Sequence, residues 1–176
     1  MPKAIRHYVR LVDRTNEVVG LVAMYSVFLI VGILLYSSVM KAVSIPPLWT
    51  LEMAQFAMVA YYMLGGGWSI KHDAHVRMDL VYDVWSPRTK AIVDSVTVLF
   101  LIFFLCIPLY GGFSSTAYAL KYGEKSYSSW APYMAPIKII MCFGIFLMLL
   151  QAVAEFFRDI LFLRGIEVRH HTEPGL

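Results

Sequence analysis

The sequence lacks ionisable side chains near the middle of each of its long apolar runs. Four such runs occupy residues 18–40, 48–70, 91–112 and 133–157, and each exceeds the roughly 18 residues that mark a membrane-spanning helix. The acids and bases closest to these runs lie at their ends. Because proton relays, ion sites and substrate pathways normally place polar or charged groups near the bilayer centre, this absence argues against a pathway within this chain alone.

Cysteine and histidine are scarce, and their positions exclude several classes of site. Cys106 and Cys142 both lie inside apolar runs, so no disulfide in an extracytoplasmic loop is indicated. A haem buried among the helices would need axial ligands there, yet all five histidines lie outside the runs. The sequence also has no glycine-rich phosphate loop, GxSxG elbow or HExxH motif. We therefore expect no enzymatic activity, no metal site and no cofactor.

The composition is typical of an integral membrane protein. Of 176 residues, 59% are hydrophobic and only 15% are charged, and a net charge of +3 gives no indication of nucleic acid binding. The first run is too long for the 7–15-residue core of a signal peptide, so we interpret it as a retained helix. The sequence predicts an all-α protein with a single four-helix membrane domain over residues 1–176, including a cytoplasmic tail at 159–176.

The distribution of basic residues predicts the orientation. Lysine and arginine concentrate in the first tail, in the loop after the second run and in the last tail, whereas the opposite side carries only four lysines: Lys41, Lys121, Lys125 and Lys138. The positive-inside rule then places both termini in the cytoplasm. In the cytoplasmic middle loop, residues 76–85 show an apolar arc opposite two aspartates, which predicts a short interfacial helix.

Polar and small residues form a stripe along the second run. At about 100° per residue its members share a sector of about 100°: Glu52, Gln55, Tyr62, Gly66 and Ser69. Because lipid offers no hydrogen bonds, such a stripe should face protein. It either seals the four-helix bundle or contacts a second membrane subunit, and both interpretations stay open. Glu52 could also bind an ion, but a carboxylate in the first helical turn is already favoured by the helix dipole.

The inner half of the fourth run carries a second stripe of the same kind. Gly144, Gln151 and Glu155 share a face with Arg158, and the last two can pair at i, i+3. The same two interpretations apply to this stripe.

The outer connection between the third and fourth runs is rich in aromatic and charged residues, including Tyr122, Glu124, Lys125 and Trp130. Such a mixture is typical of a protein-docking rim, and it suits an interfacial belt equally well. Just before this connection, Pro108 and the following glycine pair predict that the outer part of the third helix bends or loosens.

The stretch from Glu52 to Asp79 resembles the small permease subunit of TRAP transporters, the tripartite ATP-independent periplasmic carriers of DctQ or SiaQ type. The resemblance rests on Trp49-Thr50-Leu51-Glu52, on the three glycines 65–67 and on the run Ala74-His75-Val76-Arg77-Met78-Asp79. Within that run His75, Arg77 and Asp79 match the family signature, and the resemblance implies a structural role for them. The similarity extends over about residues 17–158.

The resemblance implies a non-catalytic subunit in the bacterial inner membrane. In such systems a larger permease carries the sodium and substrate sites, and a periplasmic binding protein delivers an organic acid. The small subunit would brace the larger one through the two polar stripes and help dock the binding protein through the outer connection, with membrane lipid around the rest. The alternative is a self-sufficient ion- or proton-coupled transporter acting as a homo-oligomer, for which Glu52 is the only candidate carboxylate.

Overall fold

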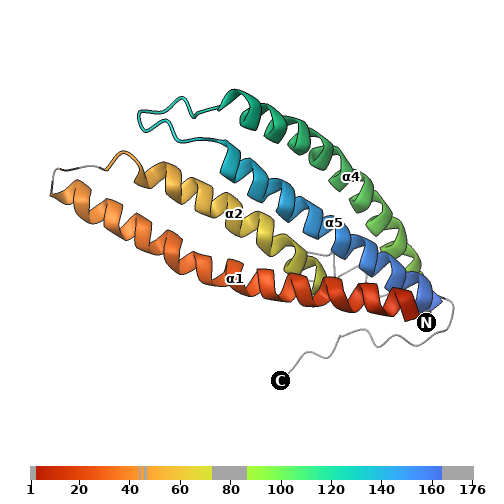
Figure 1. Cartoon of the computed structure of the whole chain (residues 1–176). Coiled ribbons are helices and arrows are strands. Elements are labelled where there is room, and N and C mark those ends of the chain that lie inside the picture. Colours follow the sequence, from red (N-terminus) through yellow and green to blue (C-terminus); the bar gives the residue numbers. More distant parts are fainter. Residues whose placement is uncertain (1–2, 44, 46, 73–86, 164–176) are drawn as a thin grey trace, which may run out of the picture.

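In a computed structural model of the chain, residues 3–43, 45, 47–72 and 87–163 can be described (Figure 1). These residues are helical apart from their connections, and the only strand-like feature among them is an isolated pairing of Lys125 with Tyr133. The all-α prediction is confirmed. The described residues form four helices: α1 Lys3–Ala42, α2 Thr50–Lys71, α4 Pro87–Tyr122 and α5 Ala135–Leu163.

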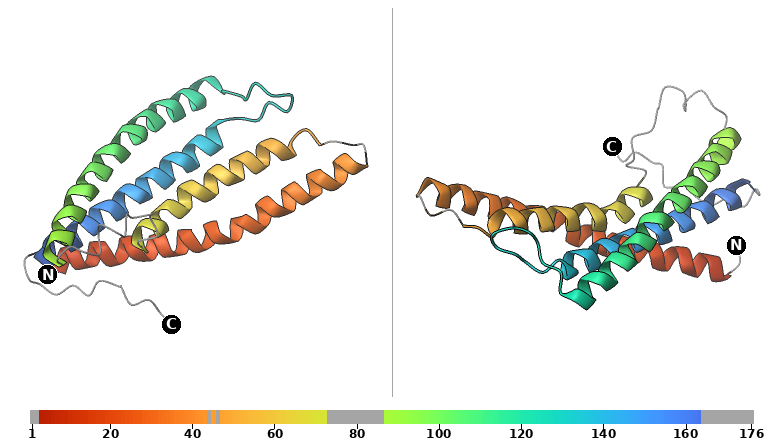
Figure 2. Two further views of the ribbon diagram at one scale, coloured as in Figure 1. Left: turned by 180° about the vertical axis from the view of Figure 1, so that it is seen from behind. Right: turned by 90° about the horizontal axis from the view of Figure 1, so that it is seen from above.

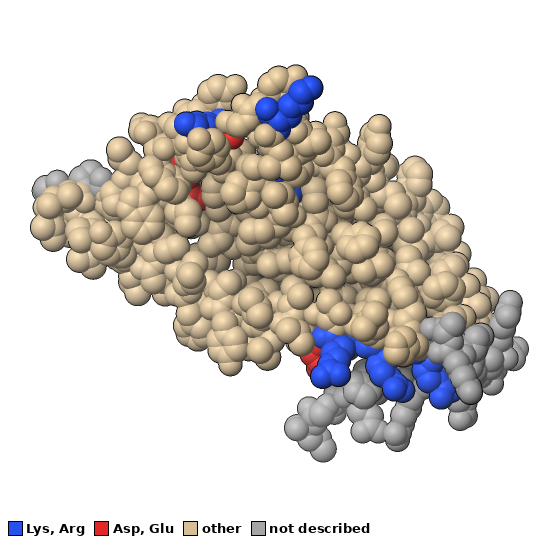
Figure 3. All heavy atoms as spheres, in the orientation of Figure 1, with Lys and Arg blue, Asp and Glu red and all other residues tan. Residues whose placement is uncertain are grey.

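Three of these helices are long and apolar enough to cross a membrane: α1, α4 and α5. Figure 3 shows the corresponding surface. Between basic groups at two edges of the molecule lies a broad middle region that consists mostly of uncharged residues. Helix α2 is shorter, at 22 residues, and its glutamine, tyrosines, glycines and serine lower its hydropathy. Its role as a fourth span stays a prediction. The predicted interfacial helix at 76–85 and most of the predicted tail lie outside the described residues.

The helices extend beyond the predicted spans. Helix α1 has 40 residues and begins at Lys3 rather than at residue 18. At about 1.5 Å per residue it is about 60 Å long, roughly twice the thickness of the hydrocarbon core. Helix α4 continues through Pro108 to Tyr122 and curves along its length (Figure 1). Because an unsatisfied backbone group is costly in lipid, a chain with an internal proline bends there rather than unfolding the helix.

The helices form two antiparallel pairs joined through their inner members. Helix α1 packs against α2, α4 packs against α5, and α2 against α5 connects the pairs. The two pairs cross when viewed from above (Figure 2), and α1 also meets α5. We call the end that holds the start of α1 and the end of α5 the terminal end. The opposite end, with the connection 123–134, is the loop end.

Glycines permit close helix contacts between the pairs. A Cβ placed on Gly144 of α5 would lie 2.7 Å from the backbone carbonyl of Met63 in α2. On the α2 side, a Cβ on Gly66 would lie 2.3 Å from the sulfur of Met148. Small residues at helix interfaces allow backbones to approach in this way. These contacts hold α2 against the middle of α5.

Candidate functional site

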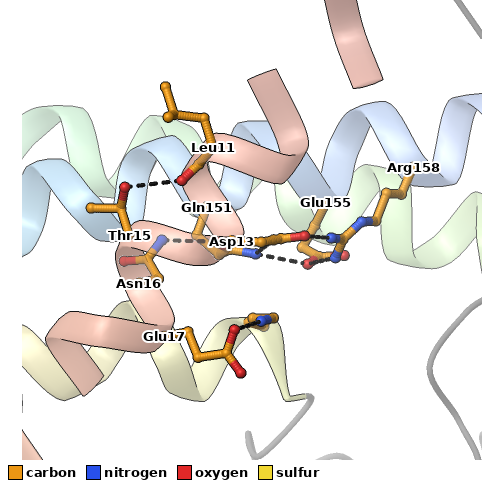
Figure 4. A network of polar contacts seen from close by, with 9 residues as sticks. Leu11, Asp13, Thr15, Asn16, Glu17, Gln151, Glu155 and Arg158 are labelled. Carbon is orange, nitrogen blue, oxygen red and sulfur yellow. Dashed lines mark hydrogen bonds and ion pairs between the residues drawn. The ribbon is translucent and has the colours of Figure 1, made fainter. Parts of the chain in front are cut away.

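A buried polar network joins α1 to α5 at the terminal end (Figure 4). Its centre is Gln151, whose side chain is 0% exposed. The Asn16 amide Nδ2 donates to Gln151 Oε1 at 2.8 Å. Gln151 Nε2 in turn lies 3.1 Å from both Asp13 Oδ1 and Glu155 Oε1. One amide therefore bridges two helices and donates to two carboxylates.

Arg158 completes the network with two ion pairs. Its Nη1 donates to Glu155 Oε1 at 2.5 Å, one helical turn away, and its Nη2 pairs with Asp13 Oδ2 across the helix interface. All three charged side chains are largely shielded, with 18–19% exposed. Because each carboxylate receives hydrogen bonds from both the guanidinium and the Gln151 amide, the cost of desolvating the charges is offset. The network therefore fastens the two helices at this level.

The network also reaches α2 through Asn16. This residue is 0% exposed, and its Oδ1 has no conventional hydrogen-bond partner in the part of the chain that the structure describes. A Cβ placed on Gly67 of α2 would lie 2.3 Å from that oxygen, so a Cα hydrogen of Gly67 points at it. Weak Cα–H···O contacts of this kind recur at helix interfaces. Nearby, Lys71 Nζ pairs with Glu17 of α1 at 3.2 Å, so two polar contacts tie the end of α2 to α1.

The stripe predicted on α5 faces the chain's own helices. Gly144 packs on α2, whereas Gln151 and Glu155 are engaged in the network. Gly66, predicted as part of the α2 stripe, packs against Met148 of α5. At these four positions the described contacts are those of a stripe that seals the helices together, the first of the two interpretations left open by the sequence.

The other members of the α2 stripe lie on an uncovered side of the helix, next to the position from which Gly66 meets α5. Gln55 and Tyr62 are exposed, Tyr62 with 64% of its surface accessible. On the same face, a Cβ on Gly65 would meet nothing within 4 Å, and Ser69 is half-buried. Glu52 is half-buried beside this face, and its Oε2 is enclosed without a hydrogen-bond partner among the described residues. Polar and small side chains are thus presented to the surroundings of the helix.

The connection at the loop end is a short, internally bonded hairpin. Ser126 N donates to the carbonyl of Pro132 at 2.9 Å, and Met134 N donates to that of Glu124 at 2.9 Å. The side chain of Glu124 is paired with Lys138 Nζ at 2.5 Å. Lys125 Nζ lies 4.8 Å from the centre of the Tyr133 ring. This part of the predicted docking rim is therefore held by hydrogen bonds within the hairpin, and its two charged members are engaged within the chain.

The aromatic members of the same rim are open to the surroundings. Tyr122 and Trp130 are exposed, and the intervening Tyr127 is fully exposed at the tip of the hairpin. Gly123 ends α4 with φ +61°, a left-handed position that glycine adopts without strain. The hairpin thus presents aromatic rings from a fixed backbone.

Sequence reasoning missed Asp13 and Asn16, because the segment before residue 18 reads as a charged tail. The signal was nevertheless present. Asp13, Asn16 and Gly20 follow an i, i+3, i+7 spacing, which places them on one helical face. Gln151, Glu155 and Arg158 follow an i, i+4, i+7 spacing. Each stripe combines an amide with charged side chains, a set of groups that can hydrogen-bond to one another.

The described polar groups tie helices to one another, and among them no three His, Cys, Asp or Glu side chains gather as metal ligands. Together with three membrane-length apolar helices, this arrangement is that of a helical membrane protein. The family model for "Tripartite ATP-independent periplasmic transporters, DctQ component" matches residues 30–162, and the chain belongs to that family. A search of curated proteins found no match. The predicted signature residues His75, Arg77 and Asp79 fall within the matched range and outside the described residues.

Proposed function

We propose that this chain is the non-catalytic small subunit of a sodium-coupled TRAP importer of organic acids, which braces the large permease subunit in the bacterial inner membrane. Family membership supports the role of a transporter component. The polar network supports the division of labour, because its charged members Asp13, Glu155 and Arg158 are paired with one another between α1 and α5. In this account, the sodium and substrate sites belong to the large subunit.

The proposed topology has four spans and two cytoplasmic termini, with α2 as the fourth span. Helix α2 runs beside the membrane-length helices α1 and α5, and its 22 residues are about 33 Å long, enough to cross the hydrocarbon core. The polar residues that lower its hydropathy are tolerable if they face protein rather than lipid. The terminal end then lies at the cytoplasmic surface, and the loop-end hairpin lies in the periplasm.

The uncovered face of α2 is the observation that carries the bracing role. Gln55 and Tyr62 offer hydrogen-bonding groups there, and Gly65 leaves room for the close approach of another helix. Hydrocarbon would leave these polar groups unsatisfied, whereas the large subunit could bind them. We assign this face, with Glu52 at its edge and Ser69 at its inner end, to the large subunit. The exposed aromatic rings of the hairpin would help dock the periplasmic binding protein.

A steric test separates this face from the others. Gly65 has nothing within 4 Å of its Cβ position, and Gly32 of α1 is equally open. Gly65→Trp should therefore leave the chain folded but block a helix that approaches α2, whereas Gly32→Trp is the matched control. Each tagged variant is expressed with the large permease, and the recovered permease is quantified. We expect at least a tenfold lower recovery for Gly65→Trp and no change for Gly32→Trp.

Two results would overturn the assignment. Full recovery of the permease with Gly65→Trp would show that the partner does not approach this face. Transport by the chain alone in liposomes would contradict the proposed function itself.

A further inference from the structure

Three arginines form an exposed row on the N-terminal part of α1. Arg6, Arg10 and Arg14 are each exposed, and their spacing of four places them within about 80° on the helix. Figure 3 shows basic groups along the lower right edge of the molecule, where the N-terminal half of α1 runs in Figure 1. Among the described residues, no acidic side chain pairs with any of the three arginines.

The opposite face of the same segment is occupied by the chain itself. Val9 and Val12 form a buried cluster with Ala154 of α5, and the Tyr8 hydroxyl donates to the carbonyl of Leu150 at 3.1 Å. The neighbouring acids are also engaged: Asp13 pairs with Arg158, and Glu17 pairs with Lys71. The row therefore stays on a fixed helix with its positive charge uncompensated by the nearest carboxylates.

A third face of this segment is apolar and uncovered. Leu11 is 61% exposed and Val18 is 59% exposed, and both lie next to Arg14 on the helical wheel. A basic row flanked by exposed apolar side chains is the arrangement of helices that lie at a membrane surface, with arginines at the headgroups and apolar groups toward the acyl chains. The excess length of α1 over the hydrocarbon core places this segment at that level.

We propose that the row formed by Arg6, Arg10 and Arg14 is a binding surface for the phosphate headgroups of anionic phospholipids. The guanidinium groups match phosphate oxygens bidentately, and Leu11 and Val18 seat the adjoining acyl chains. Bound lipid would hold the N-terminal part of α1 at the membrane surface, at the level where Asp13 and Asn16 contact α5. This role goes beyond bracing of the large subunit and requires only that the chain is inserted in a membrane.

The test is a lipid titration of the purified full chain, followed by native mass spectrometry. Phosphatidylglycerol and phosphatidylcholine are compared for the wild type, for R6Q/R10Q/R14Q and for the control K41Q/K121Q, which removes two exposed lysines at the loop end. Each basic residue near an anionic surface contributes about fivefold in affinity. We expect the triple variant to lose at least about tenfold in phosphatidylglycerol affinity, whereas the control retains it.

Further arms distinguish the alternatives. Inorganic phosphate at matched concentration should not compete, because the apolar flank contributes to lipid binding. If the triple variant is not inserted, R10Q alone should weaken phosphatidylglycerol binding about fivefold. Equal affinity of the wild type for both lipids would overturn the proposal. So would a triple variant that keeps phosphatidylglycerol binding but loses the large subunit on copurification, because the arginines would then contact protein.

Discussion

Replacement of Gln151 by leucine should weaken the contact between α1 and α5 more than any substitution on the helix surface. Leucine keeps most of the volume but removes the acceptor for Asn16 and the donor shared by Asp13 and Glu155. Arg158 still pairs with both carboxylates. The Asn16 amide, however, remains fully buried and loses the one conventional partner that it has among the described residues.

The size of the effect follows from these contacts. A buried amide left without a partner costs about 1–3 kcal/mol, and hydrogen bonds between membrane helices contribute about 0.6 kcal/mol each on average. We expect Gln151→Leu to lower the free energy of unfolding by about 2 kcal/mol. Asn16→Leu alone should cost a similar amount. The double variant should cost less than the sum, by about 1 kcal/mol, because the two amides satisfy each other.

Thermal unfolding of the purified chain in detergent measures the stability of the wild type, the two single variants and the double variant, which together form a double-mutant cycle. A loss of about 2 kcal/mol lowers Tm by about 4–8 °C for a chain of this size. The matched control is Gln55→Leu, the same substitution at an exposed position of α2, which should change Tm by little. Equal losses for Gln151→Leu and Gln55→Leu, or a coupling near zero in the double variant, would show that the bond between Asn16 and Gln151 does not stabilise the fold.

Three further predictions concern packing, charge and topology. Gly144→Ala should lower the free energy of unfolding by about 1–3 kcal/mol, because the added Cβ would lie 2.7 Å from the backbone of α2. The control is Gly111→Ala, whose Cβ would meet no described atom within 4 Å and which should leave stability unchanged or raise it in the same thermal assay. Lys138→Met should cost about 1 kcal/mol, because it removes the partner of the partly buried Glu124; a Glu124→Gln/Lys138→Met variant that does not recover part of this loss would count against the pair. In a background without the two native cysteines, Tyr127→Cys should react with a membrane-impermeant thiol reagent from the periplasmic side of intact cells, and reaction only after lysis would reverse the proposed topology.

The helices themselves could be predicted because hydrocarbon thickness dictates the length of an apolar run. Their ends were less accessible to sequence reasoning. The start of α1 at Lys3 lies among charged residues, and its helical structure there depends on packing of Val9 and Val12 against α5. The path of α4 through Pro108 depends on the cost of unpaired backbone groups in lipid. Both are consequences of the surroundings rather than of local propensity.

The sequence was enough to predict which kinds of residue form the candidate site, but it was not enough to predict what those residues contact. Helical periodicity placed Gln151 and Glu155 on one face, but it could not tell whether that face meets a partner or the chain itself. The answer depends on Asp13 and Asn16, which lie 138 and 135 positions away from Gln151 in the sequence. Conversely, Gly65 and Gly66 are neighbours, yet one faces open space and the other faces Met148. Only the tertiary arrangement distinguishes them.

The proposed bracing role requires that the uncovered face of α2 meets the large permease subunit. Its most direct test is photo-crosslinking in native membranes from a benzoylphenylalanine placed at Tyr62, compared with one at Phe103, an equally exposed residue of α4. We expect position 62 to form an adduct with the permease and position 103 to yield lipid adducts. An adduct with the permease from position 103 and only lipid adducts from position 62 would contradict it.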